Sequence, residues 1–120
     1  MGATKVILPS LARTANTDSV DLQNPKHRGM QLIIDVTAIV TSPSIVATIQ
    51  GKDPASGKYY DLVSSAAITA VGTTVLSIYP ALTGQANVKE DNGLPLDFRV
   101  SVAHANANSI TYSIGGNMLK

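Results

Sequence analysis

The sequence predicts an all-β protein: an antiparallel β-sandwich of about seven strands, Ig-like or jelly-roll-like, with an extended N-terminal arm. Apolar and polar residues alternate with a period of two in several short segments. Clusters of Gly, Pro, Asn and Ser separate these segments. No segment keeps a helical periodicity for more than about one turn. A chain of 120 residues has room for one such domain.

Residues 1–28 differ from the rest of the chain. Residues 5–8 have the composition of a short strand, but Pro9 interrupts them, and residues 14–24 are polar and turn-forming. We therefore divide the chain into an N-terminal arm or edge segment, residues 1–28, and a β-sandwich domain, residues 29–120. Two alternatives stay open for the arm: it orders only against a neighbouring molecule, or it is an ordinary first strand paired within the domain.

The strands of the sandwich are predicted from the alternation. They are residues 30–38, 45–50, 59–63, 73–79, 96–104 and 109–114. In a strand, every second side chain lies on the same face, so one set from each strand is expected to face the core. In the first two strands, one face carries Met30, Leu32, Ile34, Val36 and Ala38, and one face carries Ile45, Ala47 and Ile49. In the last two strands the residues expected to face inward are Leu96, Phe98, Val100, Val102, Ile110, Tyr112 and Ile114.

The connections between strands are rich in turn-forming residues. Residues 51–58 contain Pro and Gly where hairpin loops use them. Residues 64–71 are small and mildly apolar, which fits either a strand or an irregular crossing. Residues 81–96 form a long polar connection with space for one helical turn, and residues 115–117 are expected to end the sheet.

Charge and composition exclude several classes of partner. Only 14% of the residues are charged, against about a quarter in ordinary soluble domains, and the net charge is +1. The basic residues are scattered singly, so no stripe for nucleic acid is present. No apolar run is long enough for a signal peptide or a membrane span, and we expect a soluble protein made in the cytoplasm. A surface with few charges and many small polar groups favours protein association.

No motif for catalysis, metal binding or cofactor binding is recognisable. His27 and His104 have no metal-ligand spacing, and the chain has no cysteine. The acidic residues fall on predicted turns or outward faces, and none forms an acid–base pair by spacing. Gly115 and Gly116 precede no helix, so they do not form a phosphate-binding loop. We therefore predict that the protein is not an enzyme and needs no cofactor or metal.

Lys58, Tyr59 and Tyr60 form the one group that suggests contact with a ligand or partner. Adjacent tyrosines in a strand point to opposite faces. We expect one of them to fill the core and the other to cover the sheet edge. A protein interface and a sugar-stacking site are the alternatives.

Short blocks of residues along positions 11–116 are recognisable as an ordered set. They are Arg13-Thr14-Ala15 with Ser19, Arg28-Gly29, residues 34–38, residues 49–60, Thr73-Thr74-Val75-Leu76 with Tyr79-Pro80, Leu94-Pro95, Phe98-Arg99-Val100 and Thr111-Tyr112-Ser113. Together they resemble a family of small structural proteins encoded in the genomes of tailed bacteriophages. Where that family usually has a Trp-like position before the Arg of the late strand, this chain has Phe98.

The resemblance implies a non-enzymatic virion component, made in the host bacterial cytoplasm. The expected role is capsid decoration: a cement protein on the capsid surface, a homo-oligomer whose partner is the major capsid protein. A minor tail, neck or fibre component is the alternative. A carbohydrate-binding module is a further alternative from a different functional class. Neither nucleic acid nor a membrane is expected as a partner. The candidate protein-interface residues are Val6, Ile7, Leu8, Leu11 and Arg13 in the arm, with Lys58, Tyr59 and Tyr60.

Overall fold

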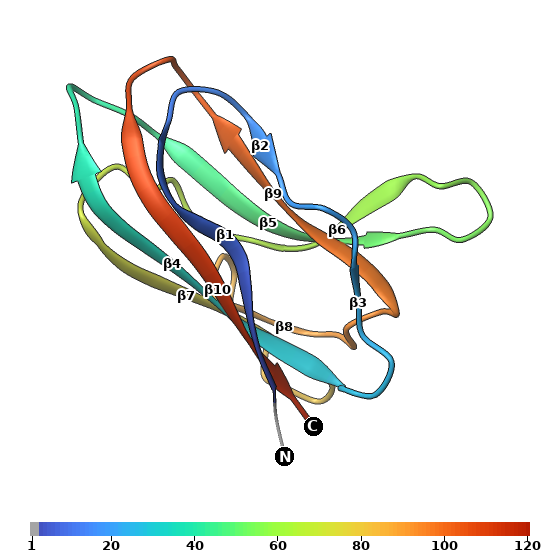
Figure 1. The fold of residues 1–120 in the computed structure, drawn as a ribbon. Helices are drawn as coiled ribbons and strands as arrows, with labels where there is room; N and C mark the ends of the chain where they lie inside the picture. Colours follow the sequence, from blue (N-terminus) through green and yellow to red (C-terminus); the bar gives the residue numbers. More distant parts are fainter. Residues whose placement is uncertain (1–2) are drawn as a thin grey trace.

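The structure is a computed structural model that describes residues 3–120. These residues form ten strands and no helix (Figure 1). The strands are β1 (Ala3–Arg13), β2 (Thr17–Asp18), β3 (Leu22–Gln23), β4 (Gly29–Ile39), β5 (Ile45–Lys52), β6 (Tyr59–Ser64), β7 (Gly72–Tyr79), β8 (Lys89–Asp91), β9 (Asp97–His104) and β10 (Ile110–Leu119). Seven of them have six or more residues. The predicted all-β class is therefore confirmed.

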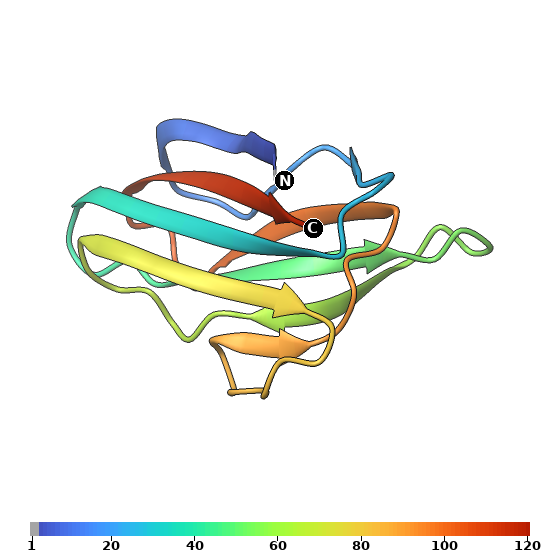
Figure 2. The same cartoon turned by 90° about the horizontal axis from the view of Figure 1, so that it is seen from below.

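The strands form two sheets that pack into a compact globule. The first sheet has the order β1-β10-β4-β7-β8, and the second has the order β2-β9-β5-β6, with β3 also beside β9. Figure 2 shows β10, β4 and β7 side by side in one layer and β9, β5 and β6 in the other. Every pair of strands is antiparallel except β7 and β8. Strand β8 lies in the connection where one helical turn was expected, and that expectation is wrong.

The core lies between the two sheets and consists of the predicted alternating residues. The inward set of β4, β5, β9 and β10 is buried, with Phe98 and Tyr112 as its largest side chains. Two positions differ from the prediction. Ala38 is exposed because the register with β10 shifts here and pairs Ala38 with the outward residue Thr111, beyond the end of the pairing with β7 at Val36. Leu96 is exposed because β9 begins only at the next residue.

Strand β10 is longer than the sequence suggested. Gly115 and Gly116 do not end the sheet, and pairing continues through Leu119. The reason is tertiary: β10 is paired on one side with β1 and on the other with β4, so backbone hydrogen bonds on both edges hold the two glycines extended. A Cβ on Gly116 would lie 3.1 Å from Ile7 Cδ1 and 3.2 Å from Met30 Sδ, so the missing side chain leaves room for the core.

The N-terminal segment is part of the sandwich. Residues 3–13 form β1 at the edge of the first sheet, and residues 17–23 cross to the second sheet, where β2 and β3 pair with β9. The extended arm is therefore not confirmed; the described residues follow the alternative of a strand paired within the domain. Residues 1 and 2 of the predicted arm lie outside the described residues. Within residues 3–120 no helix is long and apolar enough to cross a membrane.

Candidate protein-binding surfaces

The two groups of predicted interface residues lie on different sheets. The first group is on β1, an edge of the first sheet, and the second is at the start of β6, an edge of the second sheet (Figure 1). β6 lies near β7 and β8, at the far side of the first sheet from β1. The two groups therefore do not form one continuous surface.

Only two of the five predicted residues of the β1 group are exposed. The side chains of Val6 and Leu11 are 80% and 59% exposed. Ile7 and Leu8 are both buried, because the register with β10 shifts between Val6 and Leu8 and turns two consecutive side chains toward the core. Ile7 and Leu8 are therefore core residues, and they are not accessible on the surface as the predicted interface requires.

Arg13 is also buried, and its guanidinium is satisfied within the chain. Nη1 donates to the carbonyl oxygens of Tyr112 at 2.7 Å and Leu11 at 3.2 Å, and Nη2 donates to that of Pro9 at 2.7 Å. The guanidinium carbon lies 4.5 Å from the centre of the Tyr112 ring. Arg13 therefore fixes the end of β1 and offers no free charge to a partner.

Lys58 lies at the end of a loop that projects beyond the sandwich between β5 and β6 (Figure 1). Asp53 organises this loop: Oδ1 accepts a hydrogen bond from the Ala55 amide at 3.0 Å, and Oδ2 accepts one from the Ser56 hydroxyl at 2.7 Å. These bonds, the Ala55 amide first, lower the pKa of Asp53. Gly57 follows with φ of 75°, a left-handed conformation that favours glycine. Lys58 is exposed and is presented by an ordered turn.

Neither tyrosine of the predicted pair fills the core. Tyr59 lies on the outer face of the second sheet, and Tyr60 is 45% exposed. The Tyr60 ring lies across Gly51, its cross-strand neighbour, where a Cβ would be 2.7 Å from Cε2 of the ring. Tyr60 also lines a pocket of about 250 Å³ together with Lys52, Pro54, Pro95, Leu96 and Asp97. The prediction that one of the two is a core residue is wrong, because β6 is an edge strand at the open end of the sandwich.

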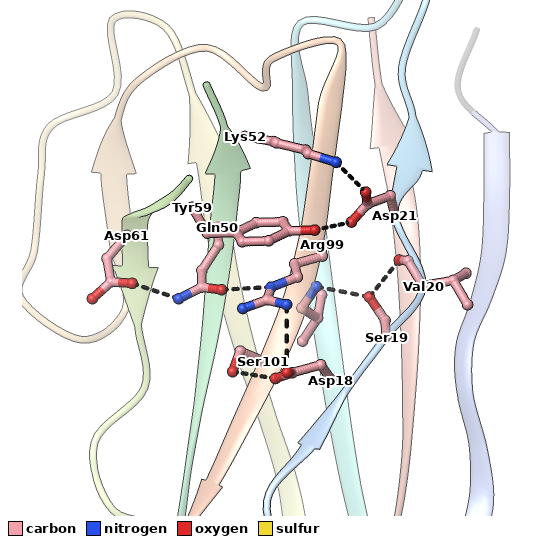
Figure 3. A network of polar contacts seen from close by, with 11 residues as sticks. Asp18, Ser19, Val20, Asp21, Gln50, Lys52, Tyr59, Asp61, Arg99 and Ser101 are labelled. Atoms are coloured by element: carbon pink, nitrogen blue, oxygen red, sulfur yellow. Dashed lines mark hydrogen bonds and ion pairs between the residues drawn. The ribbon is translucent and has the colours of Figure 1, made fainter. Parts of the chain in front are cut away.

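The outer face of the second sheet carries a network of paired charges (Figure 3). Arg99 is at its centre: Nε donates to Gln50 Oε1 at 2.8 Å, and Nη1 lies 3.4 Å from Asp18 Oδ2. Ser101 donates to Asp18 Oδ1 at 2.6 Å, and the Gln50 amide donates to Asp61 Oδ1 at 2.8 Å. Each charge is thus matched by a neighbour on the same face.

Asp21 connects a second part of this network to Tyr59. Its Oδ2 accepts a hydrogen bond from Lys52 Nζ at 2.9 Å, and its Oδ1 accepts one from the Tyr59 hydroxyl at 2.6 Å. These bonds lower the pKa of Asp21, with Lys52 as the largest cause, and the bond to Asp21 raises the pKa of Lys52 and of Tyr59. We name the surface formed by Asp18, Asp21, Gln50, Lys52, Tyr59, Asp61, Arg99 and Ser101, together with Asp97 on the same face of β9, the charged face.

The outer face of the first sheet is different. Its outward residues on β4, β7 and β10 are Gln31, Ile33, Asp35, Thr37, Thr73, Val75, Ser77, Tyr79, Thr111, Ser113, Gly115, Asn117 and Leu119, and Asp35 is the single charged residue among these three strands. The short edge strand β8 places Lys89 and Asp91 beside Ser77 and Tyr79, at the margin of this surface. We name this surface the low-charge face. Across its middle, Val6, Gly115, Ile33 and Val75 are successive cross-strand partners on β1, β10, β4 and β7. They form an apolar row between two polar rows.

The low-charge face was not predicted from the sequence. Its signal was present in the alternation, because the outward positions of residues 30–38 and 73–79 carry one charge, whereas those of residues 96–104 carry two. The sequence does not show that β4, β7 and β10 are neighbours in one sheet, so their outward positions could not be assigned to one surface. β10 is the last strand in the chain and lies between the first strand and β4.

Among residues 3–120, no group of three or more His, Asp or Glu side chains is arranged to hold a metal ion. The titratable groups of the charged face and those around Arg13 are linked by internal hydrogen bonds. The side chains of the charged face are thus held in place by bonds within the chain. Comparisons of the chain with family models, with curated proteins and with solved structures found no match.

Proposed function

We propose that this chain is a non-enzymatic structural protein of a tailed-bacteriophage virion, and more specifically a capsid decoration protein. Many copies bind the outer surface of the shell and stabilise the junctions between capsomers. The proposal combines the resemblance of the sequence blocks with one structural observation. That observation is the contrast between the charged face and the low-charge face. It favours the low-charge face as the contact surface, because covering it costs less desolvation free energy.

The sandwich itself is proposed to be of the jelly-roll type. Eight strands fall into two groups of four, β1-β10-β4-β7 and β2-β9-β5-β6, and the chain passes between the sheets as it does in jelly rolls. In this reading β2 and β3 are two parts of one edge strand, and β8 is an addition to the first sheet. Jelly rolls occur in viral capsid proteins, but also in lectins and enzymes, so the topology supports a virion role without deciding it.

The proposed contact surface is the low-charge face. Covering a charge removes it from water at a cost of several kcal/mol unless a new partner replaces the water. On the charged face, six ionised side chains would need such partners, whereas the outward positions of β10, β4 and β7 carry Asp35 alone, with Lys89 and Asp91 of β8 at the margin. Four strands about 4.8 Å apart and roughly 30 Å long present a projected area of about 600 Å². This area is of the order of the ~800 Å² per partner buried in stable interfaces.

Decoration of this kind stabilises by binding and needs no chemistry. A protein that binds the assembled shell but not its free subunits shifts the equilibrium toward the shell. Contacts with several capsid subunits at once increase the effective affinity of each weak contact. The rigid, internally paired sandwich fits this role because little conformational entropy is lost when it binds.

The number of copies per particle tests the proposed function. Quantitative mass spectrometry of purified virions of the phage that encodes the chain should find on the order of hundreds of copies, as lattice decoration requires. About six to twelve copies would indicate a ring in the tail or neck and overturn the capsid role. Absence from the virion would overturn both.

Two variants with a matched control test the contact surface. Val6→Lys and Val75→Lys each place a charge in the apolar row at a position that is exposed, so both should fold. Each is expected to weaken binding to empty shells at least about tenfold. Ala103→Lys, exposed on the opposite sheet, should bind normally. Equal loss for all three variants, or for none, would contradict the assignment of the low-charge face.

A further inference from the structure

Three side chains from different strands meet where β1 ends. Arg13 comes from β1, Tyr112 from β10 and His104 from the end of β9. The Arg13 guanidinium lies against the Tyr112 ring and binds three backbone carbonyls, two of which belong to β1 itself. Among residues 3–120 no carboxylate forms an ion pair with Arg13. The buried cation thus contacts carbonyl dipoles and an aromatic ring, and it adds these contacts to the pairing of the last part of β1 with β10.

His104 contacts the same tyrosine, Tyr112. Its Nε2 lies 3.1 Å from the Tyr112 hydroxyl, and the two ring centres are 5.9 Å apart. Its Nδ1 is buried and has no hydrogen-bond partner within residues 3–120. The elements packed around it supply Arg13 and Tyr112 as titratable groups, while Asn16, which accepts the His104 amide at 2.7 Å, and the cross-strand neighbour Ile45 are uncharged. Among the described residues, the contacts of His104 therefore include no anion that could balance a second positive charge.

We propose that Arg13, Tyr112 and His104 form an acid-sensitive latch that keeps the end of β1 attached to β10. When His104 is neutral, its Nε2 can accept a hydrogen bond from the Tyr112 hydroxyl, while the Arg13 guanidinium lies against the ring of the same tyrosine. Protonated His104 can only donate through Nε2, so the Tyr112 hydroxyl must change from donor to acceptor, and a second cation comes close to Arg13 at the Tyr112 ring. This inference is independent of the proposed function, because it concerns the isolated chain.

The end of β1 is the part of the sandwich that we expect to detach from its neighbour. β1 is paired on one side only, and its register with β10 shifts twice, between Val6 and Leu8 and between Leu8 and Leu11. After the second shift only Leu11 to Arg13 pair with β10, and the Arg13 side chain adds three hydrogen bonds to this short pairing. In contrast, β9 is paired on both sides along most of its length. Opening this end of β1 uncovers the edge of β10 from Ile110 to Tyr112, to which another strand can pair.

The direction of the pH effect follows from the environment of His104. Burial first, and the charge of Arg13 second, lower the pKa of His104 below the ordinary value of 6.5. The unfolded or opened state therefore binds the proton more tightly than the closed state. Closure is fully favoured above pH 6.5 and weakens as the pH falls through the lowered pKa. Each unit of difference between the two pKa values permits up to about a tenfold loss of protection.

Amide hydrogen exchange of the full chain, expressed as protection factors, tests the latch. Between about pH 7.5 and pH 5, the amides of residues 10–13 should lose protection several-fold, while those of β4 and β5 should not. His104→Gln cannot be protonated in this pH range and should abolish the difference. His27→Gln, which removes the other histidine, should retain it. His104→Phe serves as a second non-titrating variant if the Gln variant is poorly folded.

Three results would overturn the latch. The first is equal protection of residues 10–13 at both pH values in the unmodified protein. The second is a pH dependence that persists in both His104 variants, which would assign it to carboxylates. The third is an NMR titration in which the His104 ring takes up its proton while the amides of β1 keep their protection, which would mean that the ring turns out to solvent instead.

Discussion

The guanidinium carbon of Arg99 lies 3.5 Å from the centre of the Tyr59 ring on the charged face. The two side chains come from β9 and β6, which are separated by β5. The contact therefore spans three strands, and Gln50 of the middle strand accepts a hydrogen bond from Arg99 Nε at 2.8 Å. A stacked guanidinium in this position fixes both outer strands relative to the middle one.

The first prediction concerns this stack. Arg99→Lys keeps the charge but loses the planar group, so we expect the free energy of unfolding to fall by about 1 kcal/mol. A double-mutant cycle with Tyr59→Leu should give a coupling energy of about 0.5–1 kcal/mol, measured by urea denaturation. Tyr59→Phe, which retains the ring and loses the hydroxyl, should preserve most of the coupling. Simple additivity of Arg99→Lys and Tyr59→Leu would mean that the stack contributes nothing.

The second prediction tests the register of β9. Val100 is completely buried and Arg99 points outward, although they are adjacent. Val100→Asp puts an unpaired charge in the core and should cost several kcal/mol. Arg99→Asp loses the surface contacts and repels Asp18, which should cost about 1–2 kcal/mol. Thermal unfolding followed by circular dichroism compares them, and equal damage from both would contradict the register.

The third prediction compares two buried glycines. A Cβ on Gly29 would overlap the carbonyl oxygen of Ile78 and lie 2.6 Å from Tyr79 Cδ2, and a backbone atom cannot move away. A Cβ on Gly51 would meet only the end of the Tyr60 ring, which is a flexible side chain. We expect Gly29→Ala to cost about 2–3 kcal/mol and Gly51→Ala less.

The Tyr60 ring provides an internal check on the Gly51 explanation. In a Tyr60→Ala background the steric conflict is absent, so Gly51→Ala should then cost almost nothing. An undiminished cost of Gly51→Ala in that background, measured by urea denaturation, would show that the ring is not the cause.

The fourth prediction concerns removal of the N-terminal strand. Deleting residues 1–12 removes the buried side chains of Ile7 and Leu8, each of which contributes about 1.5–3 kcal/mol as an upper estimate. We expect the free energy of unfolding to fall by about 3–5 kcal/mol, as measured with urea. Val6→Thr, at a strongly exposed position of the same strand, should stay within about 0.5 kcal/mol. Unchanged stability of the truncated chain would restore the extended-arm alternative.

The fifth prediction is the acid response of Asp21. Its pKa in the folded protein lies below the unfolded value of 3.8, because the carboxylate accepts hydrogen bonds from Lys52 and Tyr59. Its contribution to stability is therefore present above pH 3.8 and is lost as the pH falls through the lowered pKa. The stability difference between the unmodified protein and Asp21→Asn should shrink as the pH is lowered from neutral into this range. A difference that stays constant would contradict the pKa assignment.

The sequence by itself determined the fold class and most of the core. A period of two can be read from one strand without knowing its neighbours, and for this reason the inward positions of β4, β5, β9 and β10 were predicted correctly. The exceptions, Ala38 and Leu96, lie at strand ends, where burial depends on the register and the extent of the strand pairing.

Only the tertiary structure decided which strands are neighbours and therefore which outward residues share a face. Arg13 and Ile7 look like arm residues in the sequence, but pairing with β10, nearly one hundred positions later, turns them into the sandwich. The same pairing keeps Gly115 and Gly116 in an extended strand, although two consecutive glycines predict the end of the strand. Long-range pairing of this kind is held by backbone hydrogen bonds, which leave no pattern in the side chains. The contrast between the charged and low-charge faces follows from that pairing.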